Sequence, residues 1–332
     1  MKSPFTGKEM SIATEWRSMV YRNDEFKILF HYFQCDETGE KFEDEDFARL
    51  NYIQLINQYR EKNNIPFTEQ IIDLRKKYRL PASKMSEILG FGTNSYRQYE
   101  KGEIPSHSNS RLIQLAQDPG EFKKLLSLNK SLYQKTIDKT LRTIEGILTE
   151  EIKREFERQF EQYLLGSCMP NSFTGYKCPS LTRFSNMVAF FAEKLQPWKT
   201  KLNKLLFYSD FLMFKHTGYS ISGAQYRAIP LGPVPNNYQS IYEYLATKNL
   251  VDITYNQFPD GGTGEMFRAN PDYPFKSEIF TPGELEILET VLERFKDAST
   301  NEIIEISHQE KAWIENKDER KLINYNYGFA LN

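Results

Sequence analysis

Cysteine is scarce in this sequence, and its scarcity excludes two kinds of site. The chain has 3 cysteines in 332 residues. Cys35, Cys168 and Cys178 form no C-x-x-C pair, so neither a disulfide scaffold nor a four-cysteine zinc site can be built within the chain. Cys168 and Cys178 could pair across the loop between them, but we expect reduced thiols, as is usual in a cytosol.

Catalytic motifs are missing as well. The 4 histidines lie in no H-E-x-x-H or H-x-x-x-H pattern, and there is no G-x-S-x-G, P-loop or G-x-G-x-x-G motif. The segment PDGGTG reads better as a hairpin loop than as a phosphate cradle. His216 or His308 with Asp210 could serve acid–base chemistry, although histidines satisfied within a fold are more common. We therefore expect no enzyme, no metal and no cofactor.

Long apolar runs are absent too. No run approaches the roughly 18 residues that a membrane span needs, and the N-terminus MKSPFTGKEM does not have the form of a signal peptide. We expect a cytoplasmic protein without a membrane partner. The net charge of −2 argues against a wholly basic nucleic-acid-binding protein. It still permits one DNA-reading module, because only the docking face must be positive.

Hydrophobic periodicity predicts an α+β protein that is mainly α. Residues 12–34 read as a β-hairpin, and apolar residues at every third position from Phe47 to Tyr59 predict a helix. Five short helices follow, the first with Thr68 as its N-cap. Residues 130–165 form an amphipathic helix that reads equally well as a linker packed on a neighbour or as a dimer seam. Its stripe consists of Ile137, Leu141, Ile144, Leu148, Ile152, Phe156, Phe160 and Tyr163.

The domain boundaries follow from composition. Residues 166–182 are rich in Gly, Pro and Ser, which marks a boundary before the C-terminal part. That part is expected to be mostly helical with a small β-hairpin. The predicted segments are an N-terminal module at 1–64, a helical domain at 65–128, a helical linker at 129–170 and a C-terminal domain at 171–332.

The stretch LGFGTNSYRQYEKGEIPS, residues 89–106, places two glycines before a polar helix. Two helices joined by a short Gly-containing turn describe a helix-turn-helix, whose second helix enters the DNA major groove. Asn94 and Gln98 lie on one helical face, and both amides can bond adenine. The alternative is a solvated surface helix with Tyr96 and Tyr99 partly in the core. Phosphate contacts are expected from Thr93, Ser95, Arg97, Lys101 and Lys84.

The same region resembles the helix-turn-helix domain of MqsA-type antitoxins, a branch of the Xre-like repressors. The resemblance lies in LRKKYRL at 74–80, SEILGFG at 86–92 and TNSYRQYEKG at 93–102. It implies that Asn94 and Gln98 read bases. The family commonly has Arg at the second of these positions, which points to a different target sequence here. Pro81-Ala82 replaces the family's Ser/Thr-Gln and removes a phosphate-contacting side chain.

MqsA-type proteins begin with a zinc module built on two C-x-x-C pairs. The matching segments here are Ser3-Pro4-Phe5-Thr6 and Cys35-Asp36-Glu37-Thr38, so one sulfur of four remains. Hydroxyl groups are poor zinc ligands at neutral pH. The resemblance therefore implies the same module without zinc. Aromatic packing is expected to hold it together, with candidates Trp16, Phe26, Phe30 and Phe33.

Residues 201–235, KLNKLLFYSDFLMFKHTGYSISGAQYRAIPLGPVP, resemble the Panacea (SocA-like) domain together with ISHQEKAW at 306–313. The resemblance covers roughly 175–325 and implies an antitoxin domain that neutralises unrelated toxins by direct contact. We expect GPVP to be stiff and exposed, losing little entropy on binding. Tyrosines are favoured at interface hot spots, although here they could instead cap a core. The candidate toxin contacts are Tyr226, Pro233, Pro235, Tyr238 and Tyr242.

Together these observations predict the antitoxin of a type II toxin-antitoxin system. It would neutralise a toxin encoded next to it and repress its own operon. We expect a homodimer, formed through the N-terminal or linker region, on a palindromic operator DNA. Two alternatives stay open: an antitoxin whose DNA domain is a relic, and a DNA-binding transcriptional regulator without a toxin partner.

Overall fold

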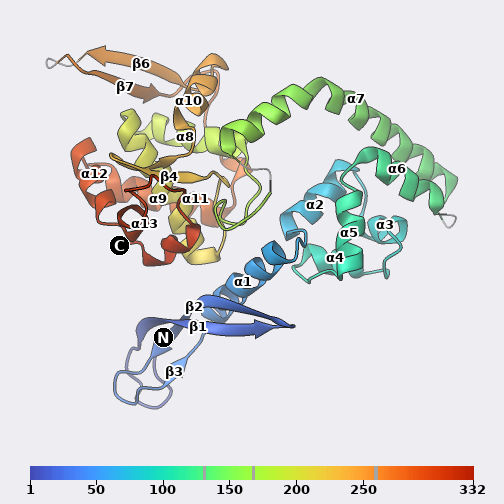
Figure 1. The fold of residues 1–332 in the computed structure, drawn as a ribbon, viewed down its shortest axis with the longest axis horizontal. Coiled ribbons are helices and arrows are strands. Elements are labelled where there is room, and N and C mark those ends of the chain that lie inside the picture. The colour runs from blue at the N-terminus through green and yellow to red at the C-terminus, as the bar shows by residue number, and fades with distance from the viewer. Residues whose placement is uncertain (130–131, 167–168, 258–260) are drawn as a thin grey trace. The chain divides into compact units, whose positions relative to one another are not determined.

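The structure is a computed structural model, and it confirms a mixed α+β protein that is mainly helical (Figure 1). For residues 151–158 it describes the helix but not the side chains. Its helices and strands divide into two compact units, residues 57–160 and residues 1–56 with 161–332. The four segments expected from the sequence have other boundaries, since 1–64 and 129–170 each cross from one unit into the other, and they stay a prediction. The residues described are 1–129, 132–166, 169–257 and 261–332.

The predicted N-terminal hairpin is confirmed. Strands β1 (Ser11–Tyr21) and β2 (Asp24–Gln34) pair antiparallel, and β3 (Lys41–Phe42) adds a short third strand beside β2. The sheet order β1-β2-β3 leaves β1 at one edge. The tight turn between the long strands places Arg22 at a positive φ of 55°.

Helix α1 (Glu45–Lys62) covers the part of the β2 edge that β3 leaves open. The Asn51 side chain accepts a hydrogen bond from the His31 N–H (2.8 Å) and donates one to the His31 carbonyl (2.9 Å). Gln54, one turn later, accepts from the Leu29 N–H (3.0 Å) and donates to the Leu29 carbonyl (2.9 Å). The two buried amides thus take the place of a neighbouring strand.

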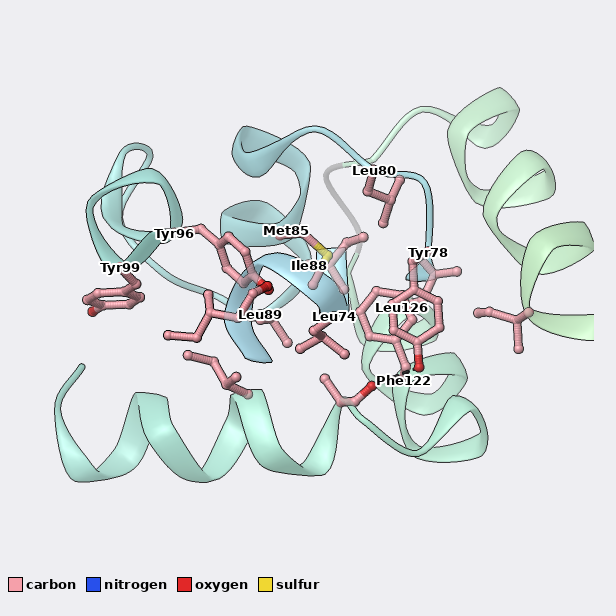
Figure 2. Close-up of a cluster of buried hydrophobic side chains, with 14 of the residues drawn as sticks. Leu74, Tyr78, Leu80, Met85, Ile88, Leu89, Tyr96, Tyr99, Phe122 and Leu126 are labelled. Atoms are coloured by element: carbon pink, nitrogen blue, oxygen red, sulfur yellow. Dashed lines mark hydrogen bonds between the residues drawn. The ribbon is translucent and has the colours of Figure 1, made fainter. Parts of the chain in front are cut away.

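A core of short helices forms the second unit (Figure 2). Tyr78 stacks on Phe122 at 3.8 Å between ring centroids, and its hydroxyl donates to the Ala116 carbonyl at 2.7 Å. Thr68 is the first helical residue rather than the expected N-cap, because the N-cap position belongs to Phe67. The helices are α2 (Thr68–Lys77), α3 (Ala82–Ile88), α4 (Ser95–Glu100), α5 (His107–Leu115) and α6 (Pro119–Leu128).

The amphipathic stripe lies on one continuous helix, α7 (Gln134–Leu165). Ile144 is fully buried in the core of the helical unit, and Ile137, Leu141 and Leu148 pack against that core. This part of the stripe is therefore packed on a neighbour within the chain. The side chains of Ile152 and Phe156 lie outside the described residues.

The C-terminal part is built around α9 (Lys199–Thr217), a helix with 12 of its 19 residues buried. Helices α8, α11 and α12 and strand β5 pack against it. Two antiparallel hairpins, β4–β5 and β6–β7, complete this part, so the expected C-terminal hairpin is confirmed. Pro259 and Asp260 of its loop lie outside the described residues, as does Cys168. The helical elements are α8 (Leu181–Leu195), α9 (Lys199–Thr217), α10 (Tyr238–Thr247), α11 (Pro282–Phe295), α12 (Thr300–His308), α13 (Lys311–Ile314), η1 (Ser277–Ile279) and η2 (Tyr325–Ala330), and the strands are β4 (Tyr226–Ile229), β5 (Gly232–Pro235), β6 (Asp252–Gln257) and β7 (Thr263–Arg268). Within the residues described, no helix has the length and apolar character to cross a bilayer.

Candidate functional site

Helices α3 and α4 are joined by a short turn and fastened to each other. Ser86, buried on α3, accepts the Tyr96 N–H on its hydroxyl at 3.1 Å, and its carbonyl accepts the Phe91 N–H at 2.8 Å. One residue therefore anchors both the turn and the start of α4. That these helices form a helix-turn-helix stays a prediction.

The inner face of α4 is anchored by two tyrosines (Figure 2). The Tyr96 hydroxyl donates to the Ile71 carbonyl at 2.7 Å, and burial raises the Tyr96 pKa. The Tyr99 hydroxyl accepts from the Asn109 amide at 2.8 Å. Both rings are buried rather than partly in the core, so α4 is fixed in orientation.

The outer face of α4 carries the predicted DNA contacts. Asn94, Arg97 and Gln98 are exposed together, as the helical spacing requires. Thr93 and Lys101 are also exposed, while Ser95 is half-buried. Lys84 lies on α3 and pairs with Glu87 at 2.6 Å, so part of its charge is neutralised within the chain. Contact between these residues and DNA stays a prediction.

Arg60 supports the end of α4, a role that no sequence pattern indicated. It lies at the end of α1 and is buried. Its guanidinium donates to the carbonyls of Gly102 at 3.1 Å and Glu103 at 3.3 Å. Because every residue has a backbone carbonyl, the sequence does not indicate which carbonyls Arg60 binds.

The two segments that match the zinc-module pattern form equivalent turns. Gly7 and Gly39 follow them with nearly equal positive φ angles of 69° and 70°. The Gly7 N–H donates to the Ser3 carbonyl at 2.9 Å, and the Gly39 N–H donates to the Cys35 carbonyl at 2.7 Å. The sequence therefore places its three hydroxyl residues and its one cysteine at corresponding positions of two matching turns.

These turns meet around the Cys35 sulfur. Hydrogen bonds from the Ser3 side chain and then from Thr38 lower the pKa of the Cys35 thiol to about 6. Thr6 Oγ1 lies 3.7 Å from the same sulfur. Three hydroxyls and one thiol are a poor donor set for zinc, which prefers thiolate, imidazole or carboxylate. No group of three or more His, Cys, Asp or Glu residues suited to a metal occurs in the described part of the chain.

In the C-terminal part, the buried carboxylate of Asp210 organises the loop after α9. One oxygen accepts the N–H groups of Ile221 and Ser222, both at 2.8 Å. The other accepts the Ser222 hydroxyl at 2.5 Å and the Tyr226 hydroxyl at 2.8 Å. Burial raises the Asp210 pKa, and the donated hydrogen bonds oppose that shift. Neither His216 nor His308 is among these donors, so the geometry does not support the acid–base pair considered from the sequence.

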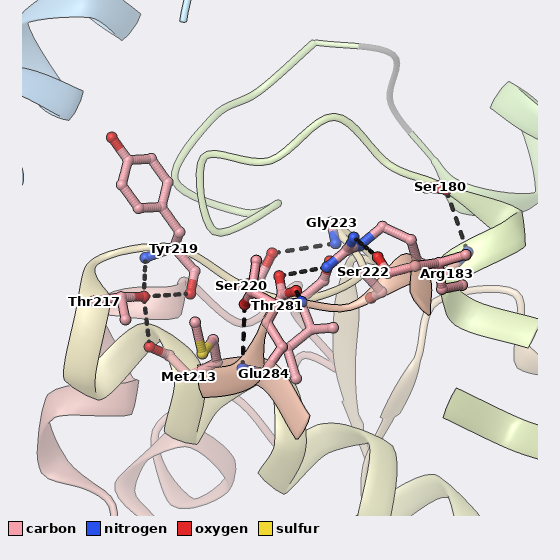
Figure 3. Close-up of polar contacts among 12 residues, drawn as sticks. Ser180, Arg183, Met213, Thr217, Tyr219, Ser220, Ser222, Gly223, Thr281 and Glu284 are labelled. Carbon is pink, nitrogen blue, oxygen red and sulfur yellow. Dashed lines mark hydrogen bonds and ion pairs between the residues drawn. The ribbon is translucent and has the colours of Figure 1, made fainter. Parts of the chain in front are cut away.

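Arg183 of α8 holds the same loop from outside (Figure 3). Its Nε donates to the Ile221 carbonyl at 2.8 Å, and its guanidinium forms an ion pair with Glu284 on α11. The Ser180 N–H donates to the Ser222 carbonyl at 3.0 Å. The loop thus joins three helices and sets the start of β4.

A buried lysine holds the second strand of the β4–β5 hairpin. Lys204 Nζ donates to the Pro233 carbonyl at 3.0 Å, and burial lowers the Lys204 pKa to about 7. Gly232 has a φ of 97°, and a Cβ there would lie 2.5 Å from the Ser307 hydroxyl and 2.6 Å from Lys204 Cε. Only glycine fits both the backbone and the space at this point.

Residues 202–314 match the family model described as Antitoxin SocA-like, Panacea domain. The match spans about a third of the chain and runs from α9 to the end of α13. It contains Lys204, Asp210 and Gly232. We refer to residues 202–314 as the Panacea region. A comparison with curated proteins finds no match. The comparisons give no support for a helix-turn-helix family in residues 65–128.

The expectation that GPVP is exposed is wrong. All four residues, Gly232 to Pro235, are buried in β5, which pairs with β4 and packs on α9 and α12. Tyr226 and Tyr242 are buried too, with the Tyr242 hydroxyl donating to Asn203 at 2.6 Å. Pro233, Pro235, Tyr226 and Tyr242 therefore offer no side-chain surface in the chain alone. Tyr238 is half-buried and remains a candidate contact.

The exposed part of this hairpin is its tip. Pro230 and Leu231 are exposed, Leu231 by 52%. Beneath them, Trp313 Nε1 donates to the Ile229 carbonyl at 2.7 Å, and the His308 ring stacks on Trp313 at 3.8 Å. We call Pro230, Leu231, His308 and Trp313 the hairpin tip. Leu231 stands directly before the GPVP motif, but no pattern in the sequence marks it as a contact.

Proposed function

We propose that this protein is a non-catalytic antitoxin that neutralises a protein toxin by direct contact through its Panacea region. The observation that supports this proposal best is the family match over the residues that build the β4–β5 hairpin. Lys204, Asp210 and Gly232 hold that hairpin in one conformation. A surface that is rigid before binding loses less conformational entropy when a partner arrives.

The hairpin tip is the surface we assign to the toxin. Leu231 supplies an exposed apolar side chain, and Trp313 is of the type enriched at binding hot spots. Tyr238 is a further candidate. Pro233, Pro235, Tyr226 and Tyr242 then act as the support beneath this surface rather than as the contacts themselves.

Co-expression with the product of the adjacent gene tests this proposal. We expect growth to be restored and the two proteins to co-purify. Leu231→Asp should weaken the complex by at least about tenfold, since it places a charge in an apolar contact. Leu128→Asp is the matched control, because Leu128 is an exposed leucine outside the Panacea region. Restored growth without a complex would contradict neutralisation by contact.

We also propose that α4 binds operator DNA and that the protein represses its own operon. The outer face of α4 exposes two amides and two cations, while Tyr96 and Tyr99 hold its inner face. A reading helix needs this combination of a polar outer face and a fixed orientation. The alternative, a regulator without a toxin, would show the same DNA binding but no toxin complex.

A gel shift with DNA from upstream of the gene tests the second proposal. Asn94→Ala with Gln98→Ala should weaken specific binding by about 2 kcal/mol or more, because each bidentate amide–adenine pair contributes about 1–3 kcal/mol. Gln239→Ala with Asn301→Ala removes two exposed amides elsewhere and should leave binding unchanged. Toxin neutralisation should survive Asn94→Ala with Gln98→Ala, because both residues lie outside the Panacea region. A wild-type chain that does not shift this DNA would show that the helical domain is a relic.

A further inference from the structure

Strand β1 presents an open edge and an apolar face. Ile12, Trp16 and Val20 share one face and are exposed by 66%, 54% and 72%. Thr14 and Ser18 lie between them on the same face and are also exposed. A strand of this length with apolar residues on an open edge is a template for pairing with another chain. Proteins usually blunt such edges with proline or lysine, and β1 contains neither.

The hydrogen bonds of β2 show which backbone groups of β1 face outward. The N–H and C=O groups of Leu29 and His31 bond to the α1 amides, so they point away from β1. Leu29 is paired with Trp16 and His31 with Thr14. In an antiparallel pair, both partners at such a position point their backbone groups away from each other. Trp16 and Thr14 therefore direct theirs to the open edge, and by alternation so do Ile12, Ser18 and Val20. Of the described residues, none is hydrogen-bonded to this edge.

The sequence of β1 is complementary to itself about Trp16. When two copies are laid antiparallel with Trp16 opposite Trp16, the hydroxyl residues Thr14 and Ser18 face each other. The β-branched apolar residues Ile12 and Val20 do so as well. Glu15 of each copy then lies opposite Arg17 of the other. Opposite charges and β-branched pairs are the cross-strand contacts that stabilise antiparallel sheets.

Neighbouring registers are less favourable because of charge. An antiparallel pair centred on Glu15 would place Glu15 opposite its own copy, and one centred on Arg17 would place two arginines together. Like charges directly opposite each other destabilise a sheet. Within one chain, Arg17 Nε already lies 2.5 Å from Glu15 Oε1. In the Trp16 register, Glu15 and Arg17 of one chain lie opposite Arg17 and Glu15 of the other, so negative and positive charges alternate.

We propose that β1 is the homodimer interface, where two copies pair antiparallel about Trp16 and form a continuous six-stranded sheet. This assignment stands independently of the toxin and DNA proposals. The even-numbered residues from Ile12 to Val20 exchange backbone hydrogen bonds. Across the joint, Ile12, Trp16 and Val20 supply the apolar side chains, and Thr14 faces Ser18. The occupant is a second copy of this chain, because the complementarity of Glu15 with Arg17 is a property of the strand with itself.

The oligomeric state of the full chain gives the first test. We expect a dimer by light scattering after size exclusion at micromolar concentration. Trp16→Lys places two lysines opposite each other and should raise the dissociation constant by at least about 50-fold. Because Trp16 is exposed, the variant should keep the wild-type circular dichroism spectrum. Tyr255→Lys, an exposed aromatic on β6, is the control and should leave the dimer intact. A wild-type monomer, or a dimer that survives Trp16→Lys, overturns the proposal.

Cross-linking tests the register. Opposed residues with exchanged hydrogen bonds have Cα atoms about 5.5 Å apart, within the range of a disulfide. Thr14→Cys and Ser18→Cys chains with different tags should therefore form a mixed disulfide when combined. Neither should cross-link with itself through the new cysteine, because identical positions lie four residues or roughly 13 Å apart. The parent chain under the same oxidation controls for its native cysteines. Self-links without the mixed product would overturn the Trp16 register.

Discussion

Lys204 Nζ lies 3.0 Å from the Pro233 carbonyl, and Gly232 leaves no room for a side chain between this lysine and Ser307. The contact joins the central helix α9 to the hairpin strand β5. A lysine, a glycine and a serine far apart in the sequence thus form one packed support beneath the hairpin tip.

Gly232→Ala tests this packing. The new Cβ would be strained at a φ of 97° and would meet Ser307 and Lys204. We expect the free energy of unfolding to fall by about 2–4 kcal/mol, measured by urea denaturation. Gly283→Ala is the matched control, since its Cβ meets nothing within 4 Å. Equal stability of the two variants would show that the hairpin adapts to a side chain here.

The buried Lys204 predicts a dependence of stability on pH. Its pKa is about 7 in the folded chain and near 10.5 when exposed, so the unfolded chain binds the extra proton between these values. Stability from this group therefore rises with pH from about 7 to 10.5 and is lost as the pH falls toward 7. Between pH 7.5 and 9, the wild type should gain about 1–2 kcal/mol relative to Lys204→Met. Parallel curves for the two proteins would contradict a lowered pKa.

Substitutions at Tyr226 and Leu231 distinguish residues that stabilise the hairpin from residues that contact the toxin. Tyr226→Phe removes one hydrogen bond to Asp210 and should cost about 1–2 kcal/mol of stability. It should leave toxin affinity unchanged at temperatures where the variant is folded. Leu231→Asp should do the reverse, weakening the complex without lowering the melting temperature. Calorimetry of both variants with the toxin checks this, and a loss of affinity in Tyr226→Phe would return that residue to the interface.

The two matching turns at the N-terminus predict that a zinc site can be introduced. Ser3→Cys, Thr6→Cys and Thr38→Cys together with Cys35 would bring four thiolates to the positions that now meet around one sulfur. We expect one zinc per chain by atomic absorption, and a higher melting temperature with zinc than without it. Adding Cys35→Ser to this variant should lower the affinity for zinc sharply. Zinc bound by the wild-type chain would contradict the predicted absence of a site.

Local patterns were sufficient to predict several helices and hairpins of this fold, but not the short strand β3. Alternating residues predicted the β1–β2 hairpin, and a three-residue spacing predicted α1, because both reflect the geometry of single elements. The outward position of Asn94 and Gln98 followed from helical spacing alone. The Panacea resemblance was carried by residues that touch in the structure, although the sequence could not show that they touch.

The predicted toxin contacts that the structure contradicts were wrong about which residues are buried. GPVP was expected to be exposed because proline and glycine are common in turns, but β5 buries it between α9 and α12. Proline can enter such a strand where its backbone nitrogen faces away from the ladder. Tyr226 and Tyr242 were assigned to a surface because composition does not tell a buried tyrosine from an exposed one. Arg60 was missed because it binds carbonyl groups, which every residue has.

The sequence by itself determined the order and type of most helices and of two hairpins, the candidate outer face of α4 and the self-complementary order of residues in β1. These properties depend on residue spacing along one element. Only the tertiary structure decided that β1 lies at an open edge, that Lys204 meets Pro233 and that Pro230 and Leu231 rather than GPVP are exposed. Such facts depend on which distant elements pack together, and packing excludes water from surfaces that no local pattern identifies.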